Sequence, residues 1–186
     1  MSLRFALLGL ISMKPASGYD LKQTIERSIN FIWNATSPQI YNTLRKLRED
    51  GYISTQDLPQ KGKPDKQIHS ITPSGREALE AFVSEPIRSS VTRDEVLLRI
   101  FLGNFTDSAA MRRELRSYLE RVREERSFLE SVEARVSSHP GPNREARRYQ
   151  LLSLRIKVAQ SRATERELIA FFEDETSPSA FLPIDG

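Results

Sequence analysis

The stretch that decides the fold of this chain is SPQIYNTLRKLREDG, residues 37–51. Its serine-proline start is typical of a helix N-terminus, because serine accepts hydrogen bonds from free N–H groups and proline presets the first turn. Ile40, Leu44 and Leu47 recur at helical spacing, and Gly51 is a typical helix stop. The stretch therefore predicts an amphipathic helix with one buried face.

The opposite face of this helix carries amide and basic side chains. At about 100° per residue, Asn42, Lys46 and their neighbours lie away from the apolar stripe. Amides pair with adenine edges, and basic groups pair with guanine or with phosphate. The helix thus offers as candidate DNA contacts Ser37, Gln39, Tyr41, Asn42, Arg45 and Lys46. The alternatives are an ordinary solvated face and, for Tyr41, simple packing on the domain.

The segments on either side of this helix complete a winged helix. Residues 3–13 are densely apolar, and residues 18–29 carry Leu21 and Ile25 at helical spacing, so both predict helices. Residues 52–58 and 66–71 are β-compatible runs, and Thr72-Pro73 starts a further helix. The order helix, helix, helix, hairpin, helix predicts a winged-helix DNA-binding domain over residues 1–85.

The loop between the two predicted strands is basic. Lys61, Lys63 and Lys66 lie around Gly62 and Pro64. Lysines on a projecting hairpin suit phosphate contacts, which add affinity without reading sequence. We expect these three lysines to contact the DNA backbone, and the alternative is an ordinary solvated turn.

The second half of the chain predicts a helical dimerisation domain over residues 93–175, after a linker at 86–92. A long helix over 107–137 has apolar residues every seven positions, at Leu115, Val122, Leu129 and Val136. A last helix over 143–174 carries Leu152 and Ile156 on one side. Because a small winged helix cannot cover two such faces, we expect a second copy of the chain to bury them. Residues 176–186 are expected to be loosely ordered.

The predicted fold class is mainly α with a small β-hairpin: a winged helix-turn-helix followed by a long-helix dimerisation domain. The chain has no cysteine, only two histidines and no glycine-rich phosphate loop, which argues against an enzyme and against a bound metal or other cofactor. It has no apolar run of about 18 residues and no export signal. We therefore expect a cytoplasmic protein with no membrane partner. The net charge of +3 decides little by itself.

Three motifs resemble the PadR family of bacterial regulators. They are Gly18-Tyr19-Asp20-Leu21, the run 37–44 with Leu47 and Gly51-Tyr52-Ile53, and Ile71-Thr72-Pro73-Ser74-Gly75-Arg76. The second half resembles the virulence-activator-like branch, whose helical arm mediates dimerisation. The resemblance implies a homodimer that binds double-stranded DNA and represses, or less often activates, nearby promoters. The wing departs from the family pattern, because Lys66-Gln67 and His69 stand where many relatives have an arginine-lysine pair and a tyrosine.

The resemblance also implies that some members respond to small aromatic or drug-like molecules. Trp33 is the only tryptophan, and with Phe5 or Phe101 it is a candidate to stack on a small aromatic effector. The alternative is that Trp33 is a core aromatic residue of the winged helix.

Two other functional interpretations stay open. The winged helix could be a protein-interaction module without specific DNA binding, although lysine is depleted at the centre of such interfaces. The second alternative is that the chain is a MarR-like regulator, although those proteins usually place dimerisation helices at both ends of the chain.

Overall fold

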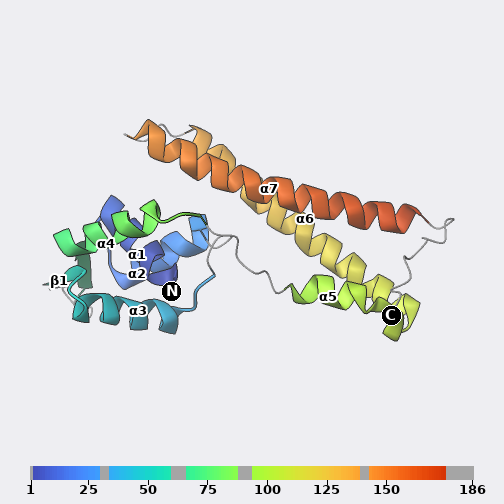
Figure 1. The fold of residues 1–186 in the computed structure, drawn as a ribbon, viewed down its shortest axis with the longest axis horizontal. Helices are drawn as coiled ribbons and strands as arrows, with labels where there is room; N and C mark the ends of the chain where they lie inside the picture. Colours follow the sequence, from blue (N-terminus) through green and yellow to red (C-terminus); the bar gives the residue numbers. More distant parts are fainter. Residues whose placement is uncertain (1, 30–33, 60–65, 88–93, 139–142, 175–186) are drawn as a thin grey trace. The chain divides into compact units, whose positions relative to one another are not determined.

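The computed structural model describes residues 2–29, 34–59, 66–87, 94–138 and 143–174. The chain divides into two compact units, Met1–Val91 (unit 1) and Thr92–Gly186 (unit 2), and both are drawn in Figure 1. Several segments with a sequence-based expectation lie outside the described residues, namely residues 30–33 with Trp33, the wing tip at 60–65, residues 88–92 of the linker and the tail at 176–186. Each unit is described by itself below.

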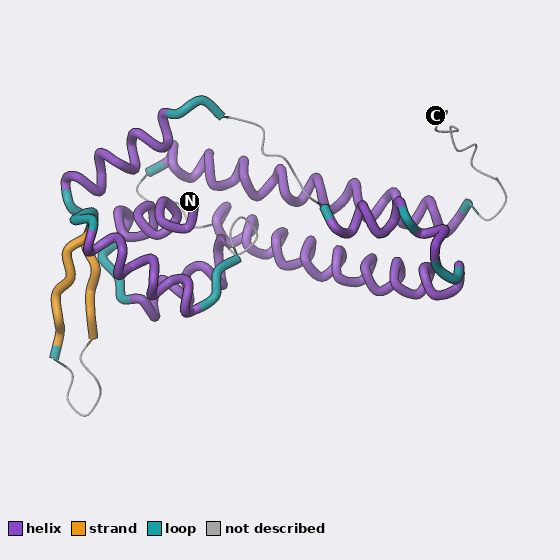
Figure 2. Tube along the Cα trace, turned by 60° about the horizontal axis from the view of Figure 1, so that its bottom comes forward, coloured by secondary structure: helices purple, strands orange, loops and turns teal. Residues whose placement is uncertain are grey.

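Unit 1 is a winged helix, as predicted. Figure 2 shows its helices together with one antiparallel hairpin. Strand β1 pairs with strand β2 from Ile53↔Ile71 to Leu58↔Lys66. Its elements in chain order are α1 (Ser2–Met13), α2 (Gly18–Thr24), the π-helical turn η1 (Ile25–Ile29), α3 (Ser37–Glu49), β1 (Ile53–Leu58), β2 (Lys66–Ile71) and α4 (Pro73–Ser84).

The apolar stripe of α3 forms the centre of the unit 1 core. Ile40, Leu44 and Leu47 are at most 3% exposed. They cluster with buried side chains of α1, α2, η1 and β1, namely Leu7, Leu8, Ile11, Leu21, Ile25 and Ile53. Each such side chain stabilises the fold by about 1.5–3 kcal/mol when fully buried. The predicted orientation of α3 is therefore confirmed.

The N-terminus of α3 differs by one residue from the prediction. Thr36 is the N-cap residue, and its backbone N–H donates to Gln39 Oε1 at 2.9 Å. Ser37 is the first helical residue and Pro38 follows within the first turn, where its missing N–H costs nothing. Gly51 ends the helix with a φ of 75°, a conformation that glycine adopts without strain.

Unit 2 consists of two short helical segments and a long helical hairpin. The short segments are α5 (Glu95–Phe101) and the 3-10 turn η2 (Gly103–Phe105), and the hairpin is α6 (Ser108–Ser138) with α7 (Arg144–Glu173). Ion pairs from Arg123 to Glu165 and from Glu133 to Arg155 show that α6 and α7 run antiparallel. In the part of the chain that the structure describes, no helix is both long and apolar enough to cross a membrane.

The seven-residue repeat of α6 is covered by the chain's own α7, which corrects one expectation. Leu115, Val122 and Leu129 are at most 6% exposed within the single chain, and Val136 is half-buried. A second copy is thus not needed to bury this stripe, because the returning helix of the same chain buries it. In contrast, Leu152 and Ile156 on α7 are 54% and 51% exposed.

A polar cluster interrupts the apolar contact between α6 and α7. Glu165 accepts from Arg123 Nε at 2.9 Å and lies 3.0 Å from Arg126 Nε. The hydrogen bond from Arg123 is the main cause that lowers the pKa of the Glu165 carboxyl. Glu130 pairs with Arg126 and with Arg162 of α7. These directional contacts favour one register of the hairpin.

Two glycines allow a matched test of the unit 1 packing. A Cβ at Gly75 would overlap the carbonyl oxygen of Tyr52, whereas a Cβ at Gly9 would meet nothing within 4 Å. We expect Gly75→Ala to lower the free energy of unfolding by about 1–3 kcal/mol and Gly9→Ala to raise it by about 0.5–1 kcal/mol. Urea unfolding followed by the fluorescence of the single tryptophan checks both. Equal stability of the two variants would contradict this packing of α4 on the β1–β2 hairpin.

Candidate nucleic-acid interface

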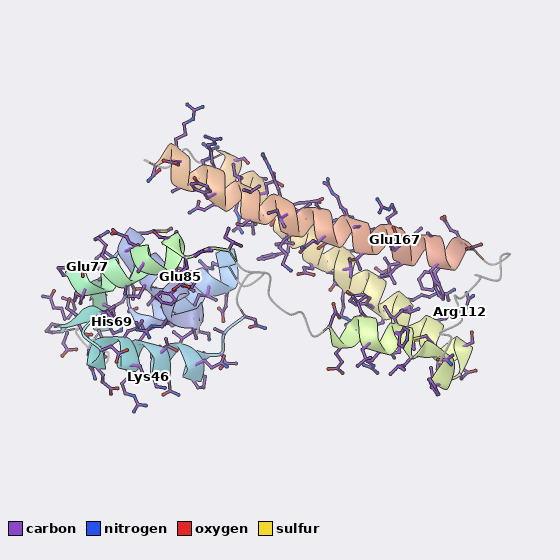
Figure 3. All side chains as sticks on the ribbon, in the orientation of Figure 1. Lys46, His69, Glu77, Glu85, Arg112 and Glu167 are labelled. Atoms are coloured by element: carbon purple, nitrogen blue, oxygen red, sulfur yellow. The ribbon has the colours of Figure 1, made fainter. Side chains whose placement is uncertain are left out.

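The face of α3 opposite its buried stripe is exposed to solvent. Asn42, Arg45 and Lys46 are all exposed, and Arg45 lies 4.0 Å from Glu49 one turn further along the helix. In Figure 3, Lys46 points away from unit 1 below α3, whereas Glu77 of α4 and Glu85, which directly follows α4, lie on the other side of that unit. The side of unit 1 that α3 presents is therefore its basic side.

The remaining candidates on α3 have more constrained surroundings. Gln39 is exposed, but its Oε1 already accepts the Thr36 N–H, so its amide is partly committed to the helix cap. Ser37 is half-buried in the first turn. Tyr41 is 51% exposed, and its ring lies so close to Gly18 that a Cβ there would overlap it. The α2 glycine thus leaves room for the tyrosine ring to pack against the start of α2.

Lys66 connects the β1–β2 hairpin to α2. Its Nζ lies 2.9 Å from Asp20 Oδ2, and this interaction is the main cause that lowers the pKa of the Asp20 carboxyl. The same carboxylate accepts hydrogen bonds from the backbone N–H and the hydroxyl of Ser17. The sequence interpretation treated Lys66 only as a phosphate contact, and the structure adds an intramolecular partner. Lys61 and Lys63 lie outside the described residues.

A second connection between the hairpin and the helices runs through His69. Its backbone N–H donates to the Ala16 carbonyl at 3.0 Å, and the Ala16 N–H donates to the His69 carbonyl at 3.2 Å. Ala16, which lies just before α2, thus forms an isolated antiparallel β-bridge with His69 of β2. The His69 ring is buried, and its Nδ1 shares a hydrogen bond of 3.0 Å with Thr55 Oγ1. Burial, and then the charge of Arg48, lower the pKa of this histidine, so the ring is neutral at pH 7.

These contacts enclose a basic pocket of about 600 Å³ between α2, α3 and β2. Three cationic side chains line it, from Arg45, Arg48 and Lys66, together with the phenol rings of Tyr19 and Tyr41. Guanidinium, ammonium and phenol groups are donors that suit a phosphodiester. The geometry supports binding of an anion. Among the described residues, no cluster of histidine, aspartate or glutamate could hold a metal ion.

The sequence interpretation missed Tyr19 and Arg48 as members of this pocket. Both are exposed. Arg48 lies three residues after Arg45 and seven after Tyr41, so the helical spacing already placed these three on one flank of α3. Tyr19 had no such signal, because its position beside α3 depends on how α2 packs.

The surroundings of two of the three residues suggested for an effector are described. The ring of Phe5 stacks on that of Phe82, with centroids 4.0 Å apart and planes 7° apart. Phe101 lines a pocket of unit 2. Trp33 lies outside the described residues. A joint role of Phe5, Trp33 and Phe101 stays a prediction.

Two family models match this chain in succession. The transcriptional regulator PadR-like family matches residues 7–81, and the virulence activator alpha C-terminal family matches residues 92–166. The probable transcriptional regulator Rv1176c of Mycobacterium tuberculosis is 30% identical over 167 residues, which cover 83% of this chain and 87% of that protein. The chain belongs to the PadR-like family of transcriptional regulators. The resemblance and the non-enzymatic function expected from the sequence are thereby confirmed.

Solved structures share the fold of this chain. The protein smu.1604c of Streptococcus mutans has a TM-score of 0.80 at 27% identity, covering 94% of this chain and 100% of its own. The negative transcriptional regulator PadR of Bacillus subtilis is 32% identical over 101 residues, 53% of this chain and 55% of that protein. Its complex with operator DNA has a TM-score of 0.76 at 22% identity, covering 93% and 98% of the two chains. It has also been crystallised with p-coumaric acid.

The buried His69 makes the stability of this PadR-like winged helix depend on pH. Its pKa in the folded state lies below 6.5, the ordinary value that applies in the unfolded chain. As pH falls through about 6.5, the unfolded chain gains a proton that the folded chain does not accept, so stability is lost toward acid, by at most about 1.4 kcal/mol per pH unit. We expect His69→Gln to reduce the pH dependence of the free energy of unfolding between pH 7 and 5.5.

Urea titrations at several pH values measure this effect, with His139→Gln as the matched control. Carboxylates such as Asp20 lose their contribution to the free energy of unfolding only at lower pH, because the pKa of Asp20 in the folded chain is lower than its ordinary value. An unchanged pH profile in His69→Gln would show that the ring does not titrate as its burial requires.

Proposed function

We propose that this PadR-like chain is a sequence-specific DNA-binding repressor that acts as a homodimer. The observation that carries the proposal is the exposed basic face of α3 beside the basic pocket, on the side of unit 1 opposite the α4 acidic residues. The B. subtilis relative whose structure contains operator DNA has the same fold. That relative is a negative regulator by name, which supports repression rather than activation.

The two parts of this surface have different tasks. Asn42, Arg45 and Lys46 on α3 would enter the major groove and contact base edges, since an α-helix fits that groove. Tyr19, Arg48 and the other pocket donors would hold a backbone phosphate beside the helix and so set its position. The wing lysines Lys61 and Lys63 would contact the backbone further along the duplex. Base contacts give specificity, and phosphate contacts give affinity that depends on salt.

Replacing Asn42 tests the base-reading role. We expect Asn42→Ala to weaken binding to a DNA fragment selected from a random pool by about 1–3 kcal/mol, with little change on unrelated DNA. Mobility-shift titration measures both affinities. Gln160→Ala on the exposed surface of α7 is the control. A second variant has Gln39, Asn42, Arg45 and Lys46 all changed to alanine. If wild type, Asn42→Ala and this second variant bind the selected fragment with equal affinity, the proposal is overturned and a protein-interaction module is favoured.

Replacing Arg48 tests the phosphate pocket. Each lost phosphate contact should reduce the dependence of log affinity on log salt by about 0.9. We expect this reduction for Arg48→Gln on specific and unrelated DNA alike. The control is Arg76→Gln, which removes the same charge from the exposed surface of α4. If both variants show the same salt dependence, the effect is one of net charge and the pocket does not hold a phosphate.

We propose that the exposed stripe of α7 is the dimer contact. Tyr149, Leu152 and Ile156 are all more than half exposed and recur at helical spacing. Phe128 of α6 is a further exposed aromatic side chain in the hairpin. A second copy that packs on such a stripe would remove apolar surface from water. In the dimer, the two α3 helices would meet half-sites about 34–36 Å apart, one turn of the duplex, or a multiple of it.

Charge on the stripe tests this contact. We expect Leu152→Glu with Ile156→Glu to produce a folded monomer, because a buried carboxylate without a partner is strongly disfavoured at an interface. Sedimentation velocity at micromolar concentration gives the oligomeric state. Gln150→Glu with Gln160→Glu adds the same charge at exposed polar positions of α7 and should leave the dimer intact. A double glutamate variant of the stripe that still sediments as a dimer would place the contact elsewhere.

We also propose that a small aromatic molecule regulates DNA binding. Support comes from the B. subtilis relative crystallised with p-coumaric acid and from the pocket of unit 2 that Phe101 lines.

A further inference from the structure

A buried histidine lines the basic pocket of unit 1. His69 comes from β2 (Figure 3) and belongs to the pocket lining together with Arg48 and Lys66. It is 7% exposed, and its Nδ1 shares a hydrogen bond with Thr55 Oγ1. Among the described residues, its other ring nitrogen, Nε2, has no hydrogen-bond partner and is not one of the fully buried polar atoms that lack one. Nε2 is therefore the ring atom available to a ligand of the pocket.

The charged groups that share the pocket lining with His69 are all positive. Arg45 and Arg48 come from α3, and Lys66 comes from β2 itself. Burial, and then the charge of Arg48, lower the pKa of the His69 ring. Without an anion in the pocket, its surroundings therefore favour the neutral ring.

The acidic groups of the neighbouring elements do not line the pocket. Asp20 of α2 pairs with Lys66 and accepts from Ser17. Asp57 of β1 is exposed and lies opposite Gln67 in the hairpin register. Helix α1 also contacts β2, and its residues 5–13 include no titratable side chain. The other titratable groups of the lining are the phenols of Tyr19 and Tyr41. An anion that enters the pocket would thus bring a negative charge that the lining itself lacks.

A phosphate in this pocket would favour the charged form of the ring. Its negative charge would offset the charge of Arg48, which disfavours the imidazolium. The ring can gain a proton without losing its contact to Thr55, because a hydroxyl can accept a hydrogen bond from Nδ1–H as well as donate one to Nδ1. Both nitrogens of an imidazolium carry hydrogen, so Nε2 would donate a charge-assisted hydrogen bond to the phosphate.

We propose that His69 is a further phosphate-binding residue of the basic pocket and that it takes up a proton as the phosphate enters. The complex then binds more protons than the free chain does, so acid favours the complex and DNA binding strengthens as pH falls through about 6.5. The inference rests on the proposed function only in taking the phosphate as part of DNA. A free tetrahedral anion shares the same chemistry, and the experiment separates the two sources.

An NMR titration of the histidine rings of the full chain tests the proposal without DNA. The chain has only two histidines, so His69→Gln and His139→Gln each assign both ring signals, even if one variant does not fold. Sulfate is the probe, because it resembles a phosphate in shape and keeps its charge over this pH range, and chloride at equal ionic strength is the control. We expect sulfate to raise the titration midpoint of His69 by at least about 0.5 pH unit and to leave that of His139 unchanged. An unchanged or lower midpoint of His69 in sulfate would overturn the proposal.

A second variant locates the anion. Arg48→Gln removes one cation of the pocket lining, whereas Arg76→Gln removes the same charge from the exposed surface of α4. We expect Arg48→Gln to raise the midpoint of His69 in chloride, because the charge of Arg48 lowers it, and to reduce the further rise in sulfate. Arg76→Gln should change neither. An equal response to sulfate in wild type and Arg48→Gln would place the anion elsewhere and overturn the proposal.

Mobility shifts with the selected DNA fragment connect the proton to DNA binding. We expect wild type to bind about three- to tenfold more tightly at pH 6 than at pH 7.5, since one proton is taken up, and His69→Gln to bind equally at both. DNA binding with the same pH dependence in wild type and His69→Gln would overturn the inference and leave the proposed function intact. A rise of the His69 midpoint in sulfate, with no DNA binding at any pH, would support the anion site and overturn only the proposed function.

Discussion

Burial of the α3 stripe is the constraint on which the rest of unit 1 depends. Ile40, Leu44 and Leu47 occupy the centre of the core, and each contributes about 1.5–3 kcal/mol. The exposed Arg45–Glu49 pair contributes about 0.3–0.5 kcal/mol at most. The apolar contacts therefore decide how α3 is rotated, and that rotation leaves Asn42, Arg45 and Lys46 in solvent. The functional face follows from the position of the core.

The contacts around α2 connect the core of unit 1 to the β1–β2 hairpin. Asp20 accepts from Ser17 and pairs with Lys66, and the backbone of Ala16 pairs with that of His69. These contacts hold β2 beside the start of α2, where Tyr41 packs on Gly18. The basic pocket is therefore a consequence of three elements held together by polar contacts. Lys66 has a structural partner as well as a place in the pocket lining.

Local features of the sequence predicted most of the fold. Helical spacing placed the α3 stripe, and proline and glycine marked helix ends to within a residue, with Thr36 rather than Ser37 as the cap. What the sequence could not predict depends on contacts between distant segments. The repeat at Leu115, Val122 and Leu129 predicted an apolar stripe correctly, but its period does not say whether α7 or a second copy covers it. Tyr19 belongs to the candidate site only because α2 packs on α3.

The central claim is that the solvent face of α3 meets DNA, and site-specific crosslinking tests it most directly. The full chain would carry p-benzoylphenylalanine at Asn42 in one preparation and at Glu77 on α4 in another, each bound to a DNA fragment selected from a random pool. On irradiation, this account predicts a protein–DNA crosslink from position 42 at bases within the protected site, and none from position 77. Crosslinks from position 77 with none from position 42 would contradict it.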